Sequence, residues 1–325
     1  MENQESFENR VNLSALKEGV ERIRGEVSKI IVGQEKMIDL ILTAILADGH
    51  ILLEGVPGVA KTLSAKLVAK SIDVDFSRIQ FTPDLMPSDV IGTSIFNMKE
   101  SEFEFKRGPI FSNIVLIDEI NRAPAKTQSA LFEAMEERQV TVDGNTYPLE
   151  APYIVLATQN PIEQEGTYRL PEAQLDRFLF KIEIGYPSVE QETEILVRET
   201  NRKSNQLDAI NAILSAKEII SFRGTLVDVL VDEKLLRYIA EIVNQTRHDH
   251  SIYLGASPRA SLALLNGSRA YAAIQGRDFV TPDDIKFLAA AVLKHRIILT
   301  PEKEMEGVNA DEVINQLVSK IAVPR

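Results

Sequence analysis

The chain contains no cysteine among its 325 residues, which excludes disulfides, thiolate metal sites and cysteine nucleophiles. Long hydrophobic runs are also missing. Apolar stretches such as 38–47 and 287–293 fall well short of the ~18–20 residues that a membrane span needs. Residues 1–10 are polar and acidic, so we expect no secretory leader. Together these absences predict a soluble, cytoplasmic protein without a membrane span.

Basic residues are the scarcer charged type. The sequence has 36 Lys and Arg against 48 Asp and Glu, a formal net charge of −12. Because phosphate backbones are bound mainly through Lys and Arg, this balance argues against general nucleic-acid binding. Hydrophobic residues make up 44% of the chain, which is enough for a sizeable core. A chain of this length usually divides into two domains.

Short apolar runs alternate with helical periodicity in the first half of the chain. The runs at 51–53, 114–117 and 153–156 are nearly continuous, as strands covered on both faces by helices tend to be. Another strand is expected at 180–184, and a helix at 34–47. This order predicts an α/β three-layer domain with a largely parallel sheet.

Two segments interrupt the pattern with hairpin signals. In 140–147, strand residues flank the two-residue turn Asp143-Gly144. A second hairpin is expected over 91–106, turning near 99–101. Neither is needed for the sheet, so both are candidate functional insertions.

Helical signals dominate after residue 187. Thr281-Pro282 predicts the start of a helix that continues to His295. We therefore expect two domains, an α/β core over 1–187 and a helical domain over 188–325.

A glycine-rich loop follows the first apolar run directly. It reads Gly55-Val56-Pro57-Gly58-Val59-Ala60-Lys61-Thr62 and opens a helix expected at 62–70. A phosphate-binding loop needs this strand–loop–helix order, because backbone N–H groups and the helix dipole then face the phosphate. Lys61 is expected to contact the β- and γ-phosphates, and the Thr62 hydroxyl to ligate Mg²⁺. Ala60 replaces the usual third glycine, at a helix start where alanine is expected to adopt the required angles.

The apolar run at 114–117 ends in two acids, Asp118 and Glu119. A carboxylate at a strand tip beside the phosphate loop suits Mg²⁺, which is the role predicted for Asp118. Glu119 can polarise the attacking water as a general base. The sequence contains no Asn-Lys-x-Asp run for reading guanine, so ATP is favoured over GTP. The residues predict an ATPase.

These motifs resemble those of AAA+ ATPases and, within that superfamily, of the MoxR family. The resemblance is carried by the phosphate loop with its alanine and by the segments 118–123, 131–140, 157–161, 170–178 and 255–260. It extends from about residue 32 to residue 292 and is densest in the core. It implies a P-loop core followed by a smaller all-α lid, ATP and Mg²⁺ as cofactors, and a homo-oligomeric ring, expected to be a hexamer.

The resemblance also implies roles for single residues of the core. Asn160 resembles sensor 1, which orients the water or the γ-phosphate. Arg177 resembles the arginine finger that reaches the neighbouring subunit's γ-phosphate, a contact that can be worth ~10³–10⁵ in rate. Val32 and Gly33 resemble the segment that lies against adenine. Each residue also has a simpler interpretation. Asn160 could be a turn asparagine, Arg177 a surface arginine paired with Asp176, and Val32 and Gly33 part of a plain loop.

Arg259 resembles the sensor 2 arginine of the lid. Ser257 is expected to cap a helix that reaches toward Gly276, which places Arg259 in the first turn. A cation there opposes the helix dipole, and a phosphate at the same helix end would compensate. We therefore expect ATP between the core and the lid of one protomer. The alternative is an arginine that extends into solvent.

The two hairpins match a helix-2 insert at 91–106 and a pre-sensor-1 hairpin at 140–147. In related assemblies such hairpins project toward a central pore or a client, although Phe103 and Phe105 could instead pack on the core. The family association implies a chaperone-like remodeller or maturation factor for protein clients, such as metal-dependent or von Willebrand A-domain proteins. The rival functions are a nucleic-acid motor and a nucleotide-gated scaffold with little turnover.

Overall fold

The computed structural model describes residues 11–56, 58–160, 168, 170–200 and 210–324. Its centre is a five-stranded sheet in the order β10-β1-β9-β6-β3, with every neighbouring pair parallel. The strands are β1 (His50–Gly55), β3 (Phe76–Gln80), β6 (Ile114–Asp118), β9 (Ile154–Gln159) and β10 (Phe178–Ile184). The parallel sheet predicted from the apolar runs is confirmed, and β3 is an additional edge strand.

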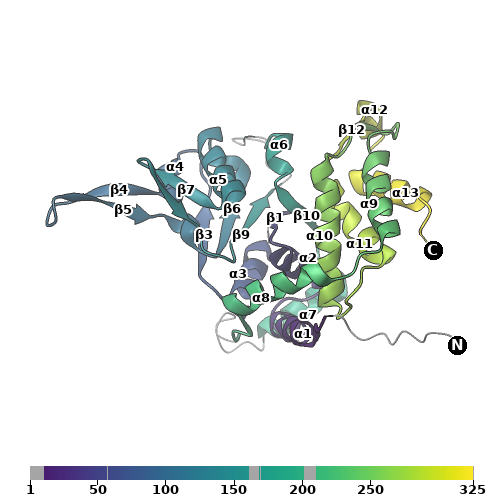
Figure 1. Cartoon of the computed structure of the whole chain (residues 1–325), viewed down its shortest axis with the longest axis horizontal. Helices are drawn as coiled ribbons and strands as arrows, with labels where there is room; N and C mark the ends of the chain where they lie inside the picture. The colour runs from purple at the N-terminus through teal and green to yellow at the C-terminus, as the bar shows by residue number, and fades with distance from the viewer. Residues whose placement is uncertain (1–10, 57, 161–167, 169, 201–209, 325) are drawn as a thin grey trace.

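Helices cover both faces of this sheet (Figure 1). In β1, Ile51 and Leu53 pack into one hydrophobic cluster and Leu52 into another. The first cluster lies under α1 (Ser14–Ser28), α2 (Glu35–Leu46) and α3 (Lys61–Ser71). The second lies under α4 (Pro87–Ile91), the 3₁₀ turns η1 (Pro109–Phe111) and η2 (Ile120–Arg122), and α5 (Ala125–Glu137). This alternation confirms the three-layer α/β core.

Both predicted hairpins form. The pair β7 (Gln139–Val142) and β8 (Asn145–Pro148) turns at Asp143-Gly144, whose φ angles are 50° and 79°. The pair β4 (Gly92–Asn97) and β5 (Glu102–Arg107) extends away from the body (Figure 1). Phe105 stacks on Tyr147 with ring centroids 4.4 Å apart, whereas Phe103 is 76% exposed. Only one of the two phenylalanines therefore packs inward.

The C-terminal part is helical, as expected. Its helices are α7 (Val189–Thr200), α8 (Ala216–Thr225), α9 (Glu233–Gln245), α10 (Pro258–Ile274), α11 (Pro282–Leu293), α12 (Pro301–Met305) and α13 (Ala310–Lys320). Short pieces accompany them: α6 (Glu172–Leu175), η4 (Leu226–Asp228), the paired β12 (Ile252–Leu254) and β13 (Ile298–Leu299), and β11 (Leu214–Ser215), which pairs with β2 (Ile72–Asp73). The helix predicted to continue to His295 ends at Leu293.

The helical part shares a core with the sheet. Gly267 of α10 lies so close to β10 that an added Cβ would come within 3.2 Å of the Phe180 ring. One continuous cluster joins the buried side chains of α2, β10, α10 and α11. Among the described residues, no helix combines the length and the apolar character that crossing a lipid bilayer requires.

Candidate nucleotide site

The phosphate loop connects β1 to α3, as its sequence predicts. Gly58 has a φ of 87°, and Ala60 has φ 61° and ψ 20°. Alanine therefore adopts these angles, and the left-handed backbone costs it ~1–2 kcal/mol. Pro57 lies outside the described residues.

Lys61 and Thr62 begin α3 and face the ends of neighbouring strands. The Lys61 Nζ donates to the backbone oxygens of Gly55, at 2.5 Å, and of Gln159, at 3.3 Å. The Thr62 Oγ1 lies 3.2 and 3.4 Å from the two carboxylate oxygens of Asp118. A hydroxyl beside a carboxylate is the hard oxygen donor set that Mg²⁺ prefers. These residues fit the magnesium and phosphate roles predicted for them.

Asp118 is buried at the end of β6 and has further partners. Its Oδ1 accepts from the Thr158 Oγ1 at 3.1 Å, and its Oδ2 from the Arg78 Nε at 2.5 Å. Arg78 comes from β3, the strand that the sequence patterns do not reveal. An ion bound by Asp118 would therefore compete with the Arg78 guanidinium.

Glu119 follows Asp118 in an unusual backbone conformation, with φ 59° and ψ 52°. Its amide donates to the Thr158 Oγ1 at 3.0 Å. Its Oε2 accepts from the Gln80 Nε2 at 2.8 Å and lies 3.0 Å from the Arg122 Nε. Non-glycine residues held in the left-handed region cluster at functional sites. The Glu119 side chain is 35% exposed, so water can reach the carboxylate.

Asn160, Val32 and Gly33 are three further predicted residues of the core. Asn160 directly follows β9 and is buried. Val32 is buried, and Gly33 has a φ of 70°. An added Cβ at Gly33 would meet the Gln191 amide nitrogen at 2.1 Å, so α7 covers this segment. The adenine role of residues 32–33 stays a prediction.

Arg177 and Arg259 lie at the other end of the sheet. His50 pairs with Phe178 at the start of β1 and β10, while Gly55 pairs with Ile184 at their carboxyl ends. Arg177 precedes Phe178, so five strand residues, ~16 Å, separate its level from that of the phosphate loop. Arg259 contacts Glu136, which is also 3.7 Å from the Arg177 Nε. The two arginines are thus brought together.

This placement corrects two expectations. Arg259 does not share the phosphate that its own chain's loop would bind, so ATP does not lie between Arg259 and Lys61 of one protomer. The charge that compensates the cation at the start of α10 is the Glu136 carboxylate instead. Glu136 shares α5 with two other acidic residues, Glu133 and Glu137, and no local pattern in the sequence distinguishes it from them.

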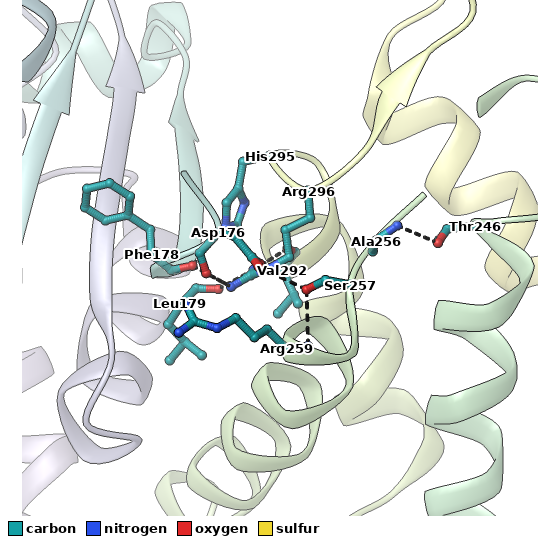
Figure 2. Close-up of polar contacts among 10 residues, drawn as sticks. All are labelled: Asp176, Phe178, Leu179, Thr246, Ala256, Ser257, Arg259, Val292, His295 and Arg296. Carbon is teal, nitrogen blue, oxygen red and sulfur yellow. Dashed lines mark hydrogen bonds and ion pairs between the residues drawn. The ribbon is translucent and has the colours of Figure 1, made fainter. Parts of the chain in front are cut away.

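Asp176 does not pair with Arg177 either. Figure 2 shows Arg296 reaching Asp176 and the backbone of Phe178 and Leu179, beside the start of α10. The Arg296 Nε donates to the Asp176 Oδ1 at 2.7 Å, and the Ser257 Oγ donates to the Asp176 Oδ2 at 2.9 Å. Asp176 therefore connects the core to the helical part.

A polar cavity of about 410 Å³ opens beside these side chains. Its charged lining residues are Asp48, Glu136, Arg138, Asp176, Arg177, Arg259 and Arg296. Four guanidinium groups against three carboxylates leave one positive charge in excess. This excess favours an anion over a cation in the cavity.

Known protein families, individual proteins and a solved structure are similar to this chain. The family model for the ATPase family associated with various cellular activities (AAA) matches residues 50–180, and an AAA lid domain model matches residues 244–317. The chain is 50% identical to the uncharacterised protein YeaC of Bacillus subtilis, over 92% of each chain. It is 44% identical to Chaperone MoxR1 of Mycobacterium tuberculosis, over 94% of this chain and 82% of the relative.

This chain belongs to the MoxR family of AAA+ ATPases. A solved structure from Cytophaga hutchinsonii, provisionally described as an ATPase, superimposes with a TM-score of 0.88 at 46% identity, covering 96% of this chain and 97% of that one. As a member of this family, the chain is expected to bind nucleotide, with Mg²⁺ as the usual ion. The family also favours an oligomeric assembly. The individual roles of the site residues stay predictions.

Proposed function

We propose that this MoxR-family protein hydrolyses ATP as a homo-oligomeric ring, a hexamer, and uses the energy to remodel protein clients. The observation that carries the proposal is that the loop and the arginines lie at opposite ends of one sheet. One protomer cannot bring these groups to the same phosphate. A head-to-tail neighbour can, and head-to-tail contacts form a ring when the rotation from one protomer to the next closes.

On the loop side, the chain's own residues bind and orient ATP. Lys61 contacts the β- and γ-phosphates, while Thr62 and Asp118 hold Mg²⁺, which when bound neutralises charge on the phosphate oxygens. Glu119 polarises the attacking water as general base. Asn160 orients that water or the γ-phosphate. The Thr62 Oγ1 lies 3.2 Å from the Asp118 Oδ1, which supports the assignment of these two residues to Mg²⁺.

On the arginine side, Arg177 and Arg259 of the neighbouring protomer stabilise the charge that develops on the γ-phosphate. Their convergence on Glu136 supports a shared role for the two side chains. The positive excess in the adjoining cavity supports an anionic partner. Arg259 accordingly acts across the subunit interface in this proposal, rather than on the nucleotide of its own chain.

The client is proposed to be a protein that contacts the β4–β5 hairpin. Phe96, Met98 and Phe103 near its tip are 52%, 87% and 76% exposed, and the two phenylalanine rings pack edge to face. An exposed apolar tip suits a protein partner. A relative at 44% identity is named a chaperone, which favours the same class. A metal-dependent or von Willebrand A-domain protein is the proposed client type.

Three variants test the hydrolytic site. Lys61→Ala should lose ATP binding, and normal affinity would reject the phosphate-loop assignment. Glu119→Gln should bind ATP but turn it over very slowly. Arg177→Ala should bind ATP without hydrolysing it, and mixing it with Lys61→Ala should restore activity, because each variant leaves the other's half of the interface intact.

The client is tested with the slow variant as a trap. Glu119→Gln is loaded with ATP or ADP, treated with nuclease, and the material retained only with ATP is identified by mass spectrometry. A retained protein supports the remodelling function. Loss of the retained material on nuclease treatment would favour a nucleic-acid motor, and wild-type ATP turnover that stays negligible at high protein concentration would favour a nucleotide-gated scaffold.

A further inference from the structure

Glu136 lies in the last turn of α5 and faces two guanidinium groups at once. Its Oε1 accepts from the Arg259 Nη2, and its Oε2 lies 3.7 Å from the Arg177 Nε. Arg177 comes from the segment before β10, and Arg259 from the first turn of α10. A single carboxylate therefore connects one arginine of the sheet domain to one of the helical part.

Helix α5 constrains Arg177 at a second point. The Arg177 Nη1 donates to the Phe132 backbone oxygen at 2.6 Å, and its guanidinium lies 5.9 Å from the centre of the Phe132 ring. The Arg177 Nη1 thus has a hydrogen-bond partner, and the Arg177 Nε faces the Glu136 carboxylate at 3.7 Å, an ion pair longer than a hydrogen bond. The Nη2 has no hydrogen-bond partner among the residues that the structure describes, so one face of the group stays available to an incoming phosphate.

Stability alone does not account for this arrangement. The side chains of Glu136, Arg177 and Arg259 are 36%, 31% and 49% exposed. Ion pairs with this much exposure contribute little to folding. Two guanidinium groups held close together also repel each other unless an anion lies between them.

We propose that Glu136 is a positioning residue that holds Arg177 and Arg259 side by side for the γ-phosphate of the next protomer. The inference rests on the proposed function, in which both arginines act across the subunit interface. Glu136 neutralises one of the two positive charges before the phosphate arrives. Because Glu136 contacts both arginines, the position of Arg177 also depends on the position of α10, which carries Arg259.

The test uses Glu136→Gln in the full-length protein, with Glu137→Gln as the matched control. Both changes remove one negative charge from the last turn of α5, but no contact joins Glu137 to either arginine among the described residues. Because ATP is bound by the chain's own loop, Glu136→Gln should lower kcat by about 10- to 100-fold, the range that a misplaced group can cost. Its KM for ATP should stay within about twofold, and Glu137→Gln should behave as wild type.

Mixing experiments identify the side of the interface on which Glu136 acts. A mixture of Glu136→Gln with Lys61→Ala should recover turnover, because an intact loop of one variant meets intact arginines of the other. A mixture of Glu136→Gln with Arg177→Ala should not recover, since both changes damage the same side. Thermal unfolding of Glu136→Gln checks that the variant is folded.

The outcomes separate this inference from the proposed function. Recovery by the Arg177→Ala and Lys61→Ala mixture supports action across the interface. Suppose that this mixture recovers ATP turnover. The positioning role is then wrong if Glu136→Gln keeps wild-type kcat, if it raises only KM, or if its mixture with Lys61→Ala recovers no turnover. In each of these cases the proposed function stands. If the Arg177→Ala mixture does not recover in rings shown by cross-linking to contain both variants, the proposed function and this inference both fail.

Discussion

Asp176→Asn should destabilise the protein markedly, because Asp176 carries the charge that balances a buried arginine. The Arg296 side chain is only 3% exposed, and its Nε donates to the Asp176 Oδ1 at 2.7 Å (Figure 2). Burial lowers the pKa of Arg296, and the Asp176 carboxylate opposes this shift. The asparagine keeps the shape and one acceptor oxygen but removes the charge.

The expected loss follows from what remains around the guanidinium. Breaking a buried ion pair by removing one partner costs ~3–5 kcal/mol. Four hydrogen bonds to backbone oxygens of Asp176, Phe178, Leu179 and Val292 survive the change. Asp176 is itself 19% exposed, so water replaces part of its field. We therefore expect a loss just below this range, about 2–3 kcal/mol in the free energy of unfolding.

Urea unfolding followed by circular dichroism at pH 7 measures this loss. Glu172→Gln is the matched control, because it removes the same charge from the neighbouring exposed helix α6 and should cost less than about 1 kcal/mol. High salt should leave the effect of Asp176→Asn largely intact, since buried pairs are weakly screened. A loss below about 1 kcal/mol, or one equal to that of the control, would refute the argument that Asp176 balances a buried charge.

Three further predictions concern the loop, the base and pH. Ala60→Gly should raise the free energy of unfolding by about 0.5–1 kcal/mol, because glycine adopts the left-handed conformation without strain. Urea unfolding measures this gain, and its absence would contradict the backbone strain inferred at Ala60. Gln80→Ala should lower kcat about tenfold with unchanged KM, because it removes one of two groups that position the Glu119 carboxylate and leaves Arg122 beside it. Steady-state kinetics measure both constants, and an unchanged kcat would reject a role for Gln80 in positioning Glu119. The free energy of unfolding should fall as the pH drops from 7 to 5. Burial lowers the pKa of His50 from 6.5 to about 3 and also lowers the pKa of His295. The unfolded chain therefore binds more protons than the folded chain in this pH range. His50 alone should account for about 2 kcal/mol at pH 5, and equal unfolding midpoints at the two pH values would contradict this.

The parts of the site that the sequence predicts well are those that local chain geometry determines. A strand, a glycine-rich turn and a helix follow one another without a gap, so the order of residues alone predicts Lys61 and Thr62 at the helix start, where a phosphate would bind. The same holds for Asp118 and Glu119 at the end of an apolar run. The Asp143-Gly144 turn is equally local, because two positive φ angles are all that it requires.

The parts that the sequence does not predict depend on pairing and packing between distant segments. Strand β3 is an edge strand with exposed polar side chains, so it lacks the apolar run that reveals a central strand. Its register with β6 sets Gln80 opposite Asp118, which brings its amide to Glu119, and Arg78 reaches Asp118 from the same strand. The spacing of residues along the chain does not predict how β3 pairs with β6.

Residues that are neighbours in the chain are enough to predict the α/β core, the phosphate loop, the acidic pair and the two hairpins. The surroundings of Arg259 follow only from the folded chain. The packing of α10 against β10 places it beside Arg177 and Glu136, at the end of the sheet away from the loop of its own chain. Packing between segments far apart in the sequence depends on complementary shapes and charges across the core, which a local pattern does not contain.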